Sequence, residues 1–234
     1  MRALLVGYGR MGKAIEIALV ARGHTIAGRL GRGEICLEGE EGRREVVAFE
    51  FTSPDAAPRL VPLLLSKKIS VVSGTTGWDI APAVQIAREQ GVPFLHSSNF
   101  SLGVAALRRA VVVAAAALAP FPEFEPGIVE RHHSAKKDAP SGTARALSLD
   151  VSGESLSQKS PPIVSLRQGG QPGEHSVFFE GADETVELVH RARSRSIFAQ
   201  GAVRAAEWML STGRRGPLSF DEFFDDLSLK GGAS

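Results

Sequence analysis

Short apolar runs alternate with helix-like stretches through the first hundred residues of the chain. Residues 3–6 form an apolar run that is typical of a buried parallel strand. Residues 13–22 carry apolar side chains at helical spacing, and Gly23 is placed to end that helix. The same criteria predict strands at 25–30, 45–51, 69–73 and 92–96, and helices at 54–68 and 79–90. This alternation predicts an α/β fold with a Rossmann-type, doubly wound parallel sheet.

The pattern changes after Asn99. An Ala/Val-rich helix is predicted over residues 102–118, where Pro120 stops it. A predicted strand at 127–130 follows, then a polar loop at 131–140 and a helix that begins at Ser141. After a surface loop at 152–162, strands are predicted at 163–167, 174–180 and 184–191. A helix at 195–212 and a short tail end the chain. This succession predicts a second, α+β domain with a mixed sheet. We expect residues 1–101 and 202–234 to form the first domain and residues 102–201 the second.

Composition narrows the possible functions. The 234 residues carry a formal net charge of +1, so no overall field would recruit nucleic acid or an anionic membrane. The longest apolar stretch, near residues 104–118, is interrupted by Arg108 and Arg109 and is not expected to cross a bilayer. Cys36 is the single cysteine, and no Cys/His spacing typical of a metal site is present. We expect a cytoplasmic protein that binds no metal, nucleic acid or membrane.

A glycine-rich segment, Gly7-Tyr8-Gly9-Arg10-Met11-Gly12, joins the first predicted strand to the first helix. Between a strand and a helix, the G-x-G-x-x-G spacing is typical of a dinucleotide site. Gly7 permits a tight turn, Gly9 lets the backbone approach a pyrophosphate, and Gly12 lets the helix pack close to the strand. The N–H groups at the helix start can bind phosphate oxygens, and Arg10 can add a charged contact.

The end of the second predicted strand bears on the choice of cofactor. A carboxylate at this point commonly binds the adenosine ribose, but this chain has Arg29 and Arg32 in that neighbourhood. Either guanidinium could pair bidentately with a 2′-phosphate, or both could be solvated without a cofactor role. Glu34 could still serve a ribose hydroxyl. The cofactor is therefore expected to be NADPH, NADH or both.

Residues 130–144 have the sequence Glu-Arg-His-His-Ser-Ala-Lys-Lys-Asp-Ala-Pro-Ser-Gly-Thr-Ala. A histidine can supply a proton near neutral pH, and lysines attract carboxylates. Ser141, Gly142 and Thr143 open a predicted helix, whose free N–H groups can bind a carboxylate. The segment thus predicts a site that binds an anion and provides a proton. The alternative is a solvated basic turn in which Asp138 or Ser141 caps the helix.

The pattern E-x-H-H-x-x-K-x-D-x-P-S-G-T-A in this segment resembles the signature of the 4-hydroxy-tetrahydrodipicolinate reductase family. The resemblance covers essentially the whole chain. Its other motifs are the glycine segment 7–12, Phe51-Thr52 with Pro54, Gly74-Thr75-Thr76-Gly77, Ser98-Asn99-Phe100-Ser101 with Gly103, and Phe198-Ala199-Gln200-Gly201-Ala202.

The resemblance implies an NAD(P)H-dependent oxidoreductase in the diaminopimelate route to lysine, which reduces a cyclic imine dicarboxylate, or its hydroxylated precursor, to tetrahydrodipicolinate. Hydride would come from the nicotinamide, His132 would donate the proton, and Lys136 would be the second catalytic residue. The substrate would contact His133, Ser141, Gly142 and Thr143. The cofactor site would comprise Gly7, Tyr8, Gly9, Arg10, Met11, Gly12, Arg29, Arg32, Gly74, Thr75, Thr76, Ser97, Ser98, Asn99 and Phe100. The second domain would bind substrate and build a homotetramer.

The chain departs from the family's common pattern at three places. Ser97-Ser98 stands where many members have two alanines, Ser53 where many have an arginine or lysine, and Gly31 where many have an acidic residue. These departures concern the cofactor rather than the reaction. The other histidines, at positions 24, 96, 175 and 190, are expected to be surface or packed residues because none adjoins a cluster of complementary groups in the sequence.

Two rival functions are compatible with the glycine segment. One is a different two-domain dehydrogenase, which would be favoured if the histidine–lysine segment lay far from the nicotinamide. The other is a nucleotide-binding redox regulator without catalysis. A regulator of that kind would need a DNA-binding module, and no basic helix-turn-helix pattern is present in the sequence.

Overall fold

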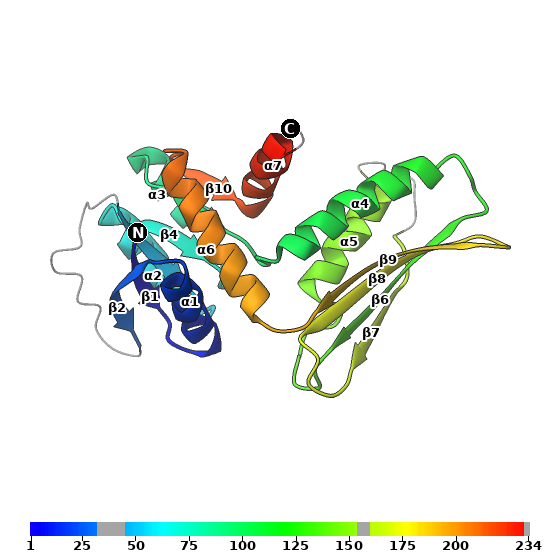
Figure 1. The fold of residues 1–234 in the computed structure, drawn as a ribbon, viewed down its shortest axis with the longest axis horizontal. Helices are drawn as coiled ribbons and strands as arrows, with labels where there is room; N and C mark the ends of the chain where they lie inside the picture. Colours follow the sequence, from blue (N-terminus) through cyan, green and yellow to red (C-terminus); the bar gives the residue numbers. More distant parts are fainter. Residues whose placement is uncertain (32–44, 154–159, 232–234) are drawn as a thin grey trace. The chain divides into compact units, whose positions relative to one another are not determined.

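The computed structural model describes residues 1–31, 45–153 and 160–231 (Figure 1). The chain divides into two compact units, one of Met1–Phe100 with Ser196–Ser234 and one of Ser101–Arg195. The chain returns to the first unit at Ser196, whereas the sequence pattern predicts the return at 202. The reason is helix α6 (Ser196–Ser211), which packs against helix α1 (Arg10–Ala21) and belongs to the first unit over its whole length.

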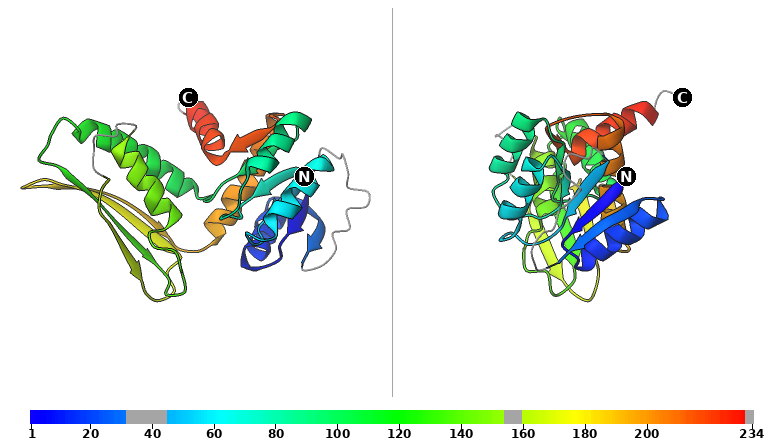
Figure 2. Two further views of the ribbon diagram at one scale, coloured as in Figure 1. Left: turned by 180° about the vertical axis from the view of Figure 1, so that it is seen from behind. Right: turned by 90° about the vertical axis from the view of Figure 1, so that its left-hand side faces the viewer.

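The first unit is built on a six-stranded parallel sheet with the strand order β10-β5-β4-β3-β1-β2. Its strands are β1 (Arg2–Val6), β2 (Thr25–Leu30), β3 (Val46–Glu50), β4 (Ser70–Ser73), β5 (Phe94–His96) and β10 (Pro217–Ser219). Helices α2 (Ala57–Ser66) and α3 (Ala81–Gln90) pack on one face, and α1 and α6 pack together on the other (Figure 2). The predicted Rossmann-type sheet is confirmed.

Strand β3 shows why this region carries a continuous apolar run. All five of its residues are buried, because helices cover both faces of the sheet. Leu4 and Val6 of β1 join a core that includes Leu60 and Leu64 of α2. Successive side chains of a strand point to opposite faces, so Leu5 packs on the side of α1 and α6.

The end of the chain differs from the prediction of a short tail. Residues Pro217–Ser219 form β10, which pairs in parallel with β5, and helix α7 (Phe220–Gly231) follows at once. The Ser219 amide donates to the Glu222 carboxylate at 2.6 Å, and the Glu222 amide donates to Ser219 Oγ at 3.1 Å. This reciprocal pair begins the helix. A strand of three residues has no usable periodicity, so only the free edge of β5 reveals it.

The second unit contains a mixed sheet, as predicted, and its four strands have the order β7-β6-β8-β9. Strand β6 (Glu125–His132) pairs in parallel with β7 (Ile163–Arg167) and antiparallel with β8 (Gly173–Glu180), which pairs antiparallel with β9 (Thr185–Ala192). Helices α4 (Leu102–Leu118) and α5 (Gly142–Ser152) cover one face of it and share an apolar core with its strands.

Strand β6 extends further than predicted at both ends. The loop predicted to begin at Arg131 begins after His132, so His132 belongs to the strand. Ile128, Glu130 and His132 lie on one face by the two-residue repeat, and all three are buried. The buried face of this strand therefore changes from apolar to ionisable along its length.

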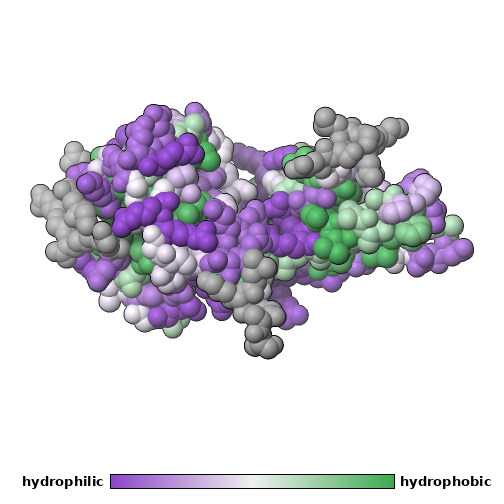
Figure 3. All heavy atoms as spheres, turned by 90° about the horizontal axis from the view of Figure 1, so that it is seen from above, coloured by the Kyte–Doolittle hydropathy of each residue, from purple (hydrophilic) through white to green (hydrophobic). Residues whose placement is uncertain are grey.

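Apolar side chains also gather on the outside of the second unit (Figure 3). Helix α4 exposes Val112 and Val113 on the side away from its core, and α5 exposes Leu149. On the open face of the sheet, Val164 and Leu166 of β7 are 53% and 41% exposed. Among the described residues, no helix combines the length and the apolar character that crossing a bilayer requires.

Candidate functional site

The glycine segment forms the predicted turn between β1 and α1. Gly7 has a φ of +94°, and a Cβ there would lie 2.3 Å from the carbonyl oxygen of Phe51. A Cβ on Gly12 would lie 2.2 Å from the carbonyl oxygen of Gly7, so the helix can begin this close to the turn only with glycine. Gly9 is the N-cap of α1, and the space above its backbone is open. The turn therefore offers exposed helix N–H groups to an anion, as a pyrophosphate site requires.

A cavity of about 620 Å³ lies beside this turn, at the carboxyl ends of β1, β2 and β3. In open α/β sheets, ligands bind at these ends of the strands. The residues that line it are Val6, Gly7, Tyr8, Gly9, Leu30, Gly31, Phe51, Thr52, Ser53, Ala56, Arg59 and Leu60. Of the predicted cofactor residues, the structure thus places Gly7, Tyr8 and Gly9 around one cavity. It adds Arg59, which no sequence pattern singles out.

Arg29, one of the two arginines predicted to meet the cofactor from the end of β2, is not among the described residues that line this cavity. The Arg29 guanidinium pairs with the Glu16 carboxylate and lies over the Tyr8 ring, 5.8 Å from the ring centre. Hydrogen bonds from Arg29 and Tyr8 lower the pKa of Glu16 to about 2. Arg29 is therefore already engaged by a carboxylate of α1. Arg32 lies outside the described residues, as do Glu34 and Cys36.

The remaining predicted cofactor residues lie in the first turn of α1 and in the loops after β4 and β5. Their side chains mostly make internal contacts. A Cβ on Gly74 would lie 2.1 Å from the Phe51 ring, and Phe100 is buried with its ring 5.7 Å from that of Phe51. Ser97 Oγ donates to the carbonyl oxygen of Asn99 at 2.8 Å. Thr76, Ser98, Arg10 and the half-buried Met11 leave atoms accessible to a ligand.

Thr75 is organised by a carboxylate that the sequence pattern does not reveal. Glu50, the last residue of β3, is fully buried, and it accepts hydrogen bonds at 2.6 Å from both Ser73 Oγ and Thr75 Oγ1. The backbone amide of Thr52 donates to the same carboxylate at 3.0 Å. This network joins the loops after β3 and β4. Such a network can hold the two loops in a fixed conformation beside a ligand.

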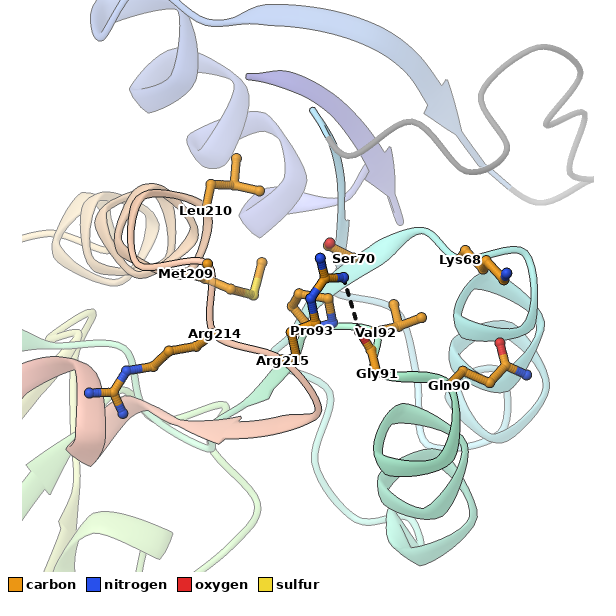
Figure 4. A pocket seen from close by; sticks show the side chains of 11 residues that line it. Lys68, Ser70, Gln90, Gly91, Val92, Pro93, Met209, Leu210, Arg214 and Arg215 are labelled. Atoms are coloured by element: carbon orange, nitrogen blue, oxygen red, sulfur yellow. Dashed lines mark hydrogen bonds between the residues drawn. The ribbon is translucent and has the colours of Figure 1, made fainter.

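A different cavity, of about 440 Å³, lies at the opposite ends of the strands (Figure 4). It is lined by Lys68 and Ser70 at the start of β4 and by Arg214 and Arg215 before β10. Arg215 donates to the carbonyl oxygen of Gly91 at 3.4 Å, which is the dashed bond in Figure 4. None of the predicted site residues lines this cavity.

In the second unit, the described structure gathers ionisable groups around Glu130. One carboxylate oxygen, Oε1, accepts hydrogen bonds from Arg167 and Ser165 at 2.7 Å and from the Ser141 amide at 3.0 Å. The other, Oε2, lies 3.3 Å from His132 Nδ1. Burial raises the pKa of Glu130, but these donors outweigh it and hold that pKa far below the usual range. Glu130 is therefore a buried carboxylate that is charged at neutral pH.

His175 completes this cluster, contrary to the prediction that it has no complementary neighbours. It is 4% exposed and lies opposite Glu130 in the β6–β8 pairing, with Nε2 3.8 Å from Glu130 Oε2 and 3.3 Å from Ser141 Oγ. Its ring meets that of His132 edge-on, with centres 5.1 Å apart. Burial, followed by the charge of His132, lowers the pKa of His175 to about 4. Strand register brings these residues together across a long interval of sequence.

Among the described residues, Glu130, His132 and His175 offer ligand atoms that all lie within 4.8 Å of one another, which is a spacing that metal sites use. The carboxylate already has a cation on it, because Arg167 binds Oε1. A divalent ion would compete with that guanidinium in a buried space. The arrangement is better suited to holding a histidine ring in a fixed orientation than to holding a metal.

The segment after β6 places the other predicted residues near the start of α5. Ser141 caps this helix, and its Oγ accepts from the Ala144 amide at 3.2 Å, as the alternative interpretation predicts. Gly142 is exposed in the first turn of the helix, and Thr143 is half-buried beside it. Lys136 pairs with Asp138 at 2.7 Å, and His133 Nε2 lies 3.0 Å from an Arg195 nitrogen. The capping role and an anion site are compatible, because the first N–H groups of α5 stay at the surface.

The fold and these two sites define a class of protein: a two-unit oxidoreductase with a dinucleotide-binding sheet and an α+β unit that carries buried histidines. Two family descriptions match the chain, "Dihydrodipicolinate reductase, N-terminus" over residues 1–100 and "Dihydrodipicolinate reductase, C-terminus" over residues 103–223. The chain therefore belongs to the dihydrodipicolinate reductase family.

Individual relatives agree with this assignment. The chain is 43% identical over 165 residues to 4-hydroxy-tetrahydrodipicolinate reductase of Xanthomonas campestris pv. campestris, covering 70% of this chain and 67% of that protein. It is 35% identical over 221 residues to the same-named protein of Christiangramia forsetii, covering 89% and 92%. The dipicolinate-bound dihydrodipicolinate reductase from Paenisporosarcina sp. TG-14 shares the fold with a TM-score of 0.71 at 20% identity, over 94% of this chain and 97% of that one.

Proposed function

We propose that the protein is an NAD(P)H-dependent 4-hydroxy-tetrahydrodipicolinate reductase, which forms tetrahydrodipicolinate in the diaminopimelate route to lysine. The observation that carries the proposal is the buried Glu130–His132 pair at the start of the His-His-x-x-Lys segment. A carboxylate that cannot easily be protonated faces one nitrogen of a histidine ring. This arrangement places a negative charge beside one nitrogen of the ring. The substrate name comes from the relatives.

In this proposal, His132 is the proton donor. A bound nicotinamide would supply hydride to one ring carbon of the substrate. His132 would give a proton to the adjacent carbon, so that the ring would gain two hydrogens. For the hydroxylated precursor, the hydroxyl group leaves as water before the reduction. With Nδ1 turned toward Glu130, the other ring nitrogen, Nε2, is the atom that transfers the proton.

Lys136 and the start of α5 bind the substrate's two carboxylates. Lys136 is paired with Asp138, and its ammonium can turn from that exposed side chain to a carboxylate of the substrate. The N–H groups of Gly142 and Thr143 at the helix start suit the other carboxylate. His133 and Ser141 lie in the same segment and complete the substrate site. Cation and helix dipole both stabilise negative charge as it develops.

The first unit binds the dinucleotide. The turn Gly7–Gly12 meets the pyrophosphate, and the neighbouring cavity of about 620 Å³ takes the adenosine half. The exposed residues after β4 and β5, among them Thr76 and Ser98, lie on the side of the nicotinamide. Either NADPH or NADH supplies the hydride, since the reaction needs only the nicotinamide ring.

We also propose a homotetramer in which the open face of the mixed sheet contacts other copies. Val164 and Leu166 are apolar and exposed on adjacent outward positions of β7. Contiguous apolar side chains of this kind are typical of a protein interface. The variant Val164→Glu/Leu166→Glu should sediment as a smaller species than the unmodified protein. An unmodified protein that sediments as a monomer would contradict the tetramer.

The activity test is NAD(P)H oxidation with freshly generated product of dihydrodipicolinate synthase. We expect oxidation that depends on this product, and His132→Gln should lower kcat by roughly 10²-fold with little change in KM. His24→Gln is the matched control, because that histidine pairs with Glu207 in the first unit. If neither NADPH nor NADH is oxidised, the proposed function is wrong. If His132→Gln keeps normal turnover, the proton-donor role is wrong.

A further inference from the structure

The cavity beside the glycine turn has an unusual charge balance for an adenosine site. Its lining residues include the carboxyl ends of three strands, where a carboxylate commonly binds the ribose hydroxyls. Yet no aspartate or glutamate is among them, and Gly31 stands at the end of β2. The one charged side chain among the described residues that line the cavity is Arg59.

Arg59 is also available to a ligand. Its side chain is exposed, and it forms no ion pair with any carboxylate that the structure describes. Arg29 differs in both respects, because Glu16 and Tyr8 already engage it and it does not line the cavity. The two arginines thus differ: Arg29 stabilises the contact between β2 and α1, and Arg59 remains available to a ligand.

The position of Arg59 in its helix favours an anion as the ligand. Arg59 stands in the first turn of α2, where a positive side chain opposes the helix dipole and does not stabilise the helix. Ala56 and Leu60, on either side of Arg59, line the same cavity with apolar groups. An anion next to an apolar surface matches a phosphorylated nucleoside.

We propose that Arg59 binds the 2′-phosphate of NADPH and makes this protein prefer NADPH to NADH. The inference rests on the proposed function insofar as the first unit must bind a nicotinamide dinucleotide. A guanidinium pairs bidentately with a phosphate, and such a pair is stronger than its contact with a neutral ribose hydroxyl. The pyrophosphate, common to both cofactors, is bound by the turn at Gly7–Gly12 and does not discriminate between them.

The test compares ligands that differ by one phosphate. Calorimetric titration of the full-length protein with 2′,5′-ADP and with 5′-AMP measures the contribution of that group, and titration with NADPH and NADH measures it in the whole cofactor. We expect 2′,5′-ADP to bind about tenfold or more tightly than 5′-AMP, and NADPH to bind more tightly than NADH by a similar factor. In Arg59→Ala both ratios should fall to near one, mainly through weaker binding of the phosphorylated ligand. Arg59→Lys should give intermediate ratios, because it keeps the charge without the planar fork.

Two further variants make the result specific to Arg59. Arg88→Ala removes an equal charge from the surface of α3 and should keep both ratios. Arg29→Ala should keep them as well, since that guanidinium is bound to Glu16. Thermal melting of each variant checks that the fold is intact.

Three outcomes would overturn the proposal. The first is an affinity ratio near one between the phosphorylated and unphosphorylated ligands in the unmodified protein, and the second is an unchanged ratio in Arg59→Ala. The third is an equal loss of affinity for both ligands in Arg59→Ala, which would indicate that Arg59 stacks on the adenine instead. If the unmodified protein binds and oxidises neither cofactor, the proposed function itself has failed. If both cofactors are bound and oxidised while Arg59→Ala keeps the ratio, only the role of Arg59 is wrong.

Discussion

Glu130 Oε2 lies 3.3 Å from His132 Nδ1, on the buried face of a single strand. The two residues are separated by one position, so the strand's two-residue repeat places their side chains side by side. Arg167, Ser165 and the Ser141 amide bind the far oxygen of the carboxylate and keep it from rotating. The geometry resembles the histidine–carboxylate pairs in which the acid orients the ring that transfers the proton.

Replacing Glu130 by glutamine should therefore impair turnover more than binding. The amide keeps the shape but removes the negative charge beside His132, and we expect kcat to fall by roughly 10- to 10³-fold with a small change in KM. The pH dependence of kcat should shift as well, which a purely structural role would not cause. Steady-state kinetics across pH measure both effects. Glu125→Gln, at the exposed start of the same strand, is the control and should keep normal kinetics.

Lys136 and Lys137 offer a matched pair of substitutions. Lys136 is partly buried and held by Asp138, whereas Lys137 is exposed. We expect Lys136→Ala to lower kcat/KM by roughly 10²-fold, because it removes a charge that stabilises the transition state. Lys137→Ala should change kcat/KM by less than about twofold, as expected for a screened surface charge. Equal losses in the two variants would indicate that the segment acts only through its overall charge.

Acid should destabilise the second unit through His175. Burial, with the charge of His132, lowers its folded-state pKa to about 4 from the ordinary 6.5. The unfolded chain therefore binds a proton more readily, and stability falls as pH drops from about 6.5 toward about 4. By pH 5, this group alone is expected to lower the free energy of unfolding by about 2 kcal/mol. Thermal melting between pH 7.5 and pH 5 should show a smaller drop in Tm for His175→Gln than for the unmodified protein. Parallel pH profiles would mean that His175 is not the titrating group.

Gly201 should be intolerant of even one added methyl group. A Cβ at this point of α6 would lie 1.7 Å from the carbonyl oxygen of Phe100, which is backbone and cannot turn aside. We expect Gly201→Ala to cost about 1–3 kcal/mol or more and to lower Tm by several degrees. Gly127→Ala is the control, since a Cβ there meets no atom within 4 Å. A normal Tm for Gly201→Ala would show that α6 can shift at little cost. The glycine at position 201 thus has a packing explanation.

The chain's sequence by itself determined the elements with strong periodicity. Short apolar runs bounded by glycines predicted the parallel sheet, and a strand–glycine–helix pattern predicted the turn at Gly7–Gly12, because these signals depend on local sterics and spacing. The length of helix 102–118 followed from its composition and the proline after it. The histidine–lysine segment also indicated a chemistry, since adjacent residues offer a titratable ring, a cation and a helix start.

Tertiary structure alone decided which distant residues share a site. Glu130 and His175 meet because β6 and β8 pair in one particular register, and a shift of one position would turn His175 to the opposite face. Arg59 lines the cavity beside the glycine turn because α2 begins beside the ends of three strands, whereas Arg29, adjacent in sequence to the expected position, is paired with Glu16. Strand β10 exists because β5 has a free edge. Each of these depends on pairing between remote segments, which local patterns do not encode.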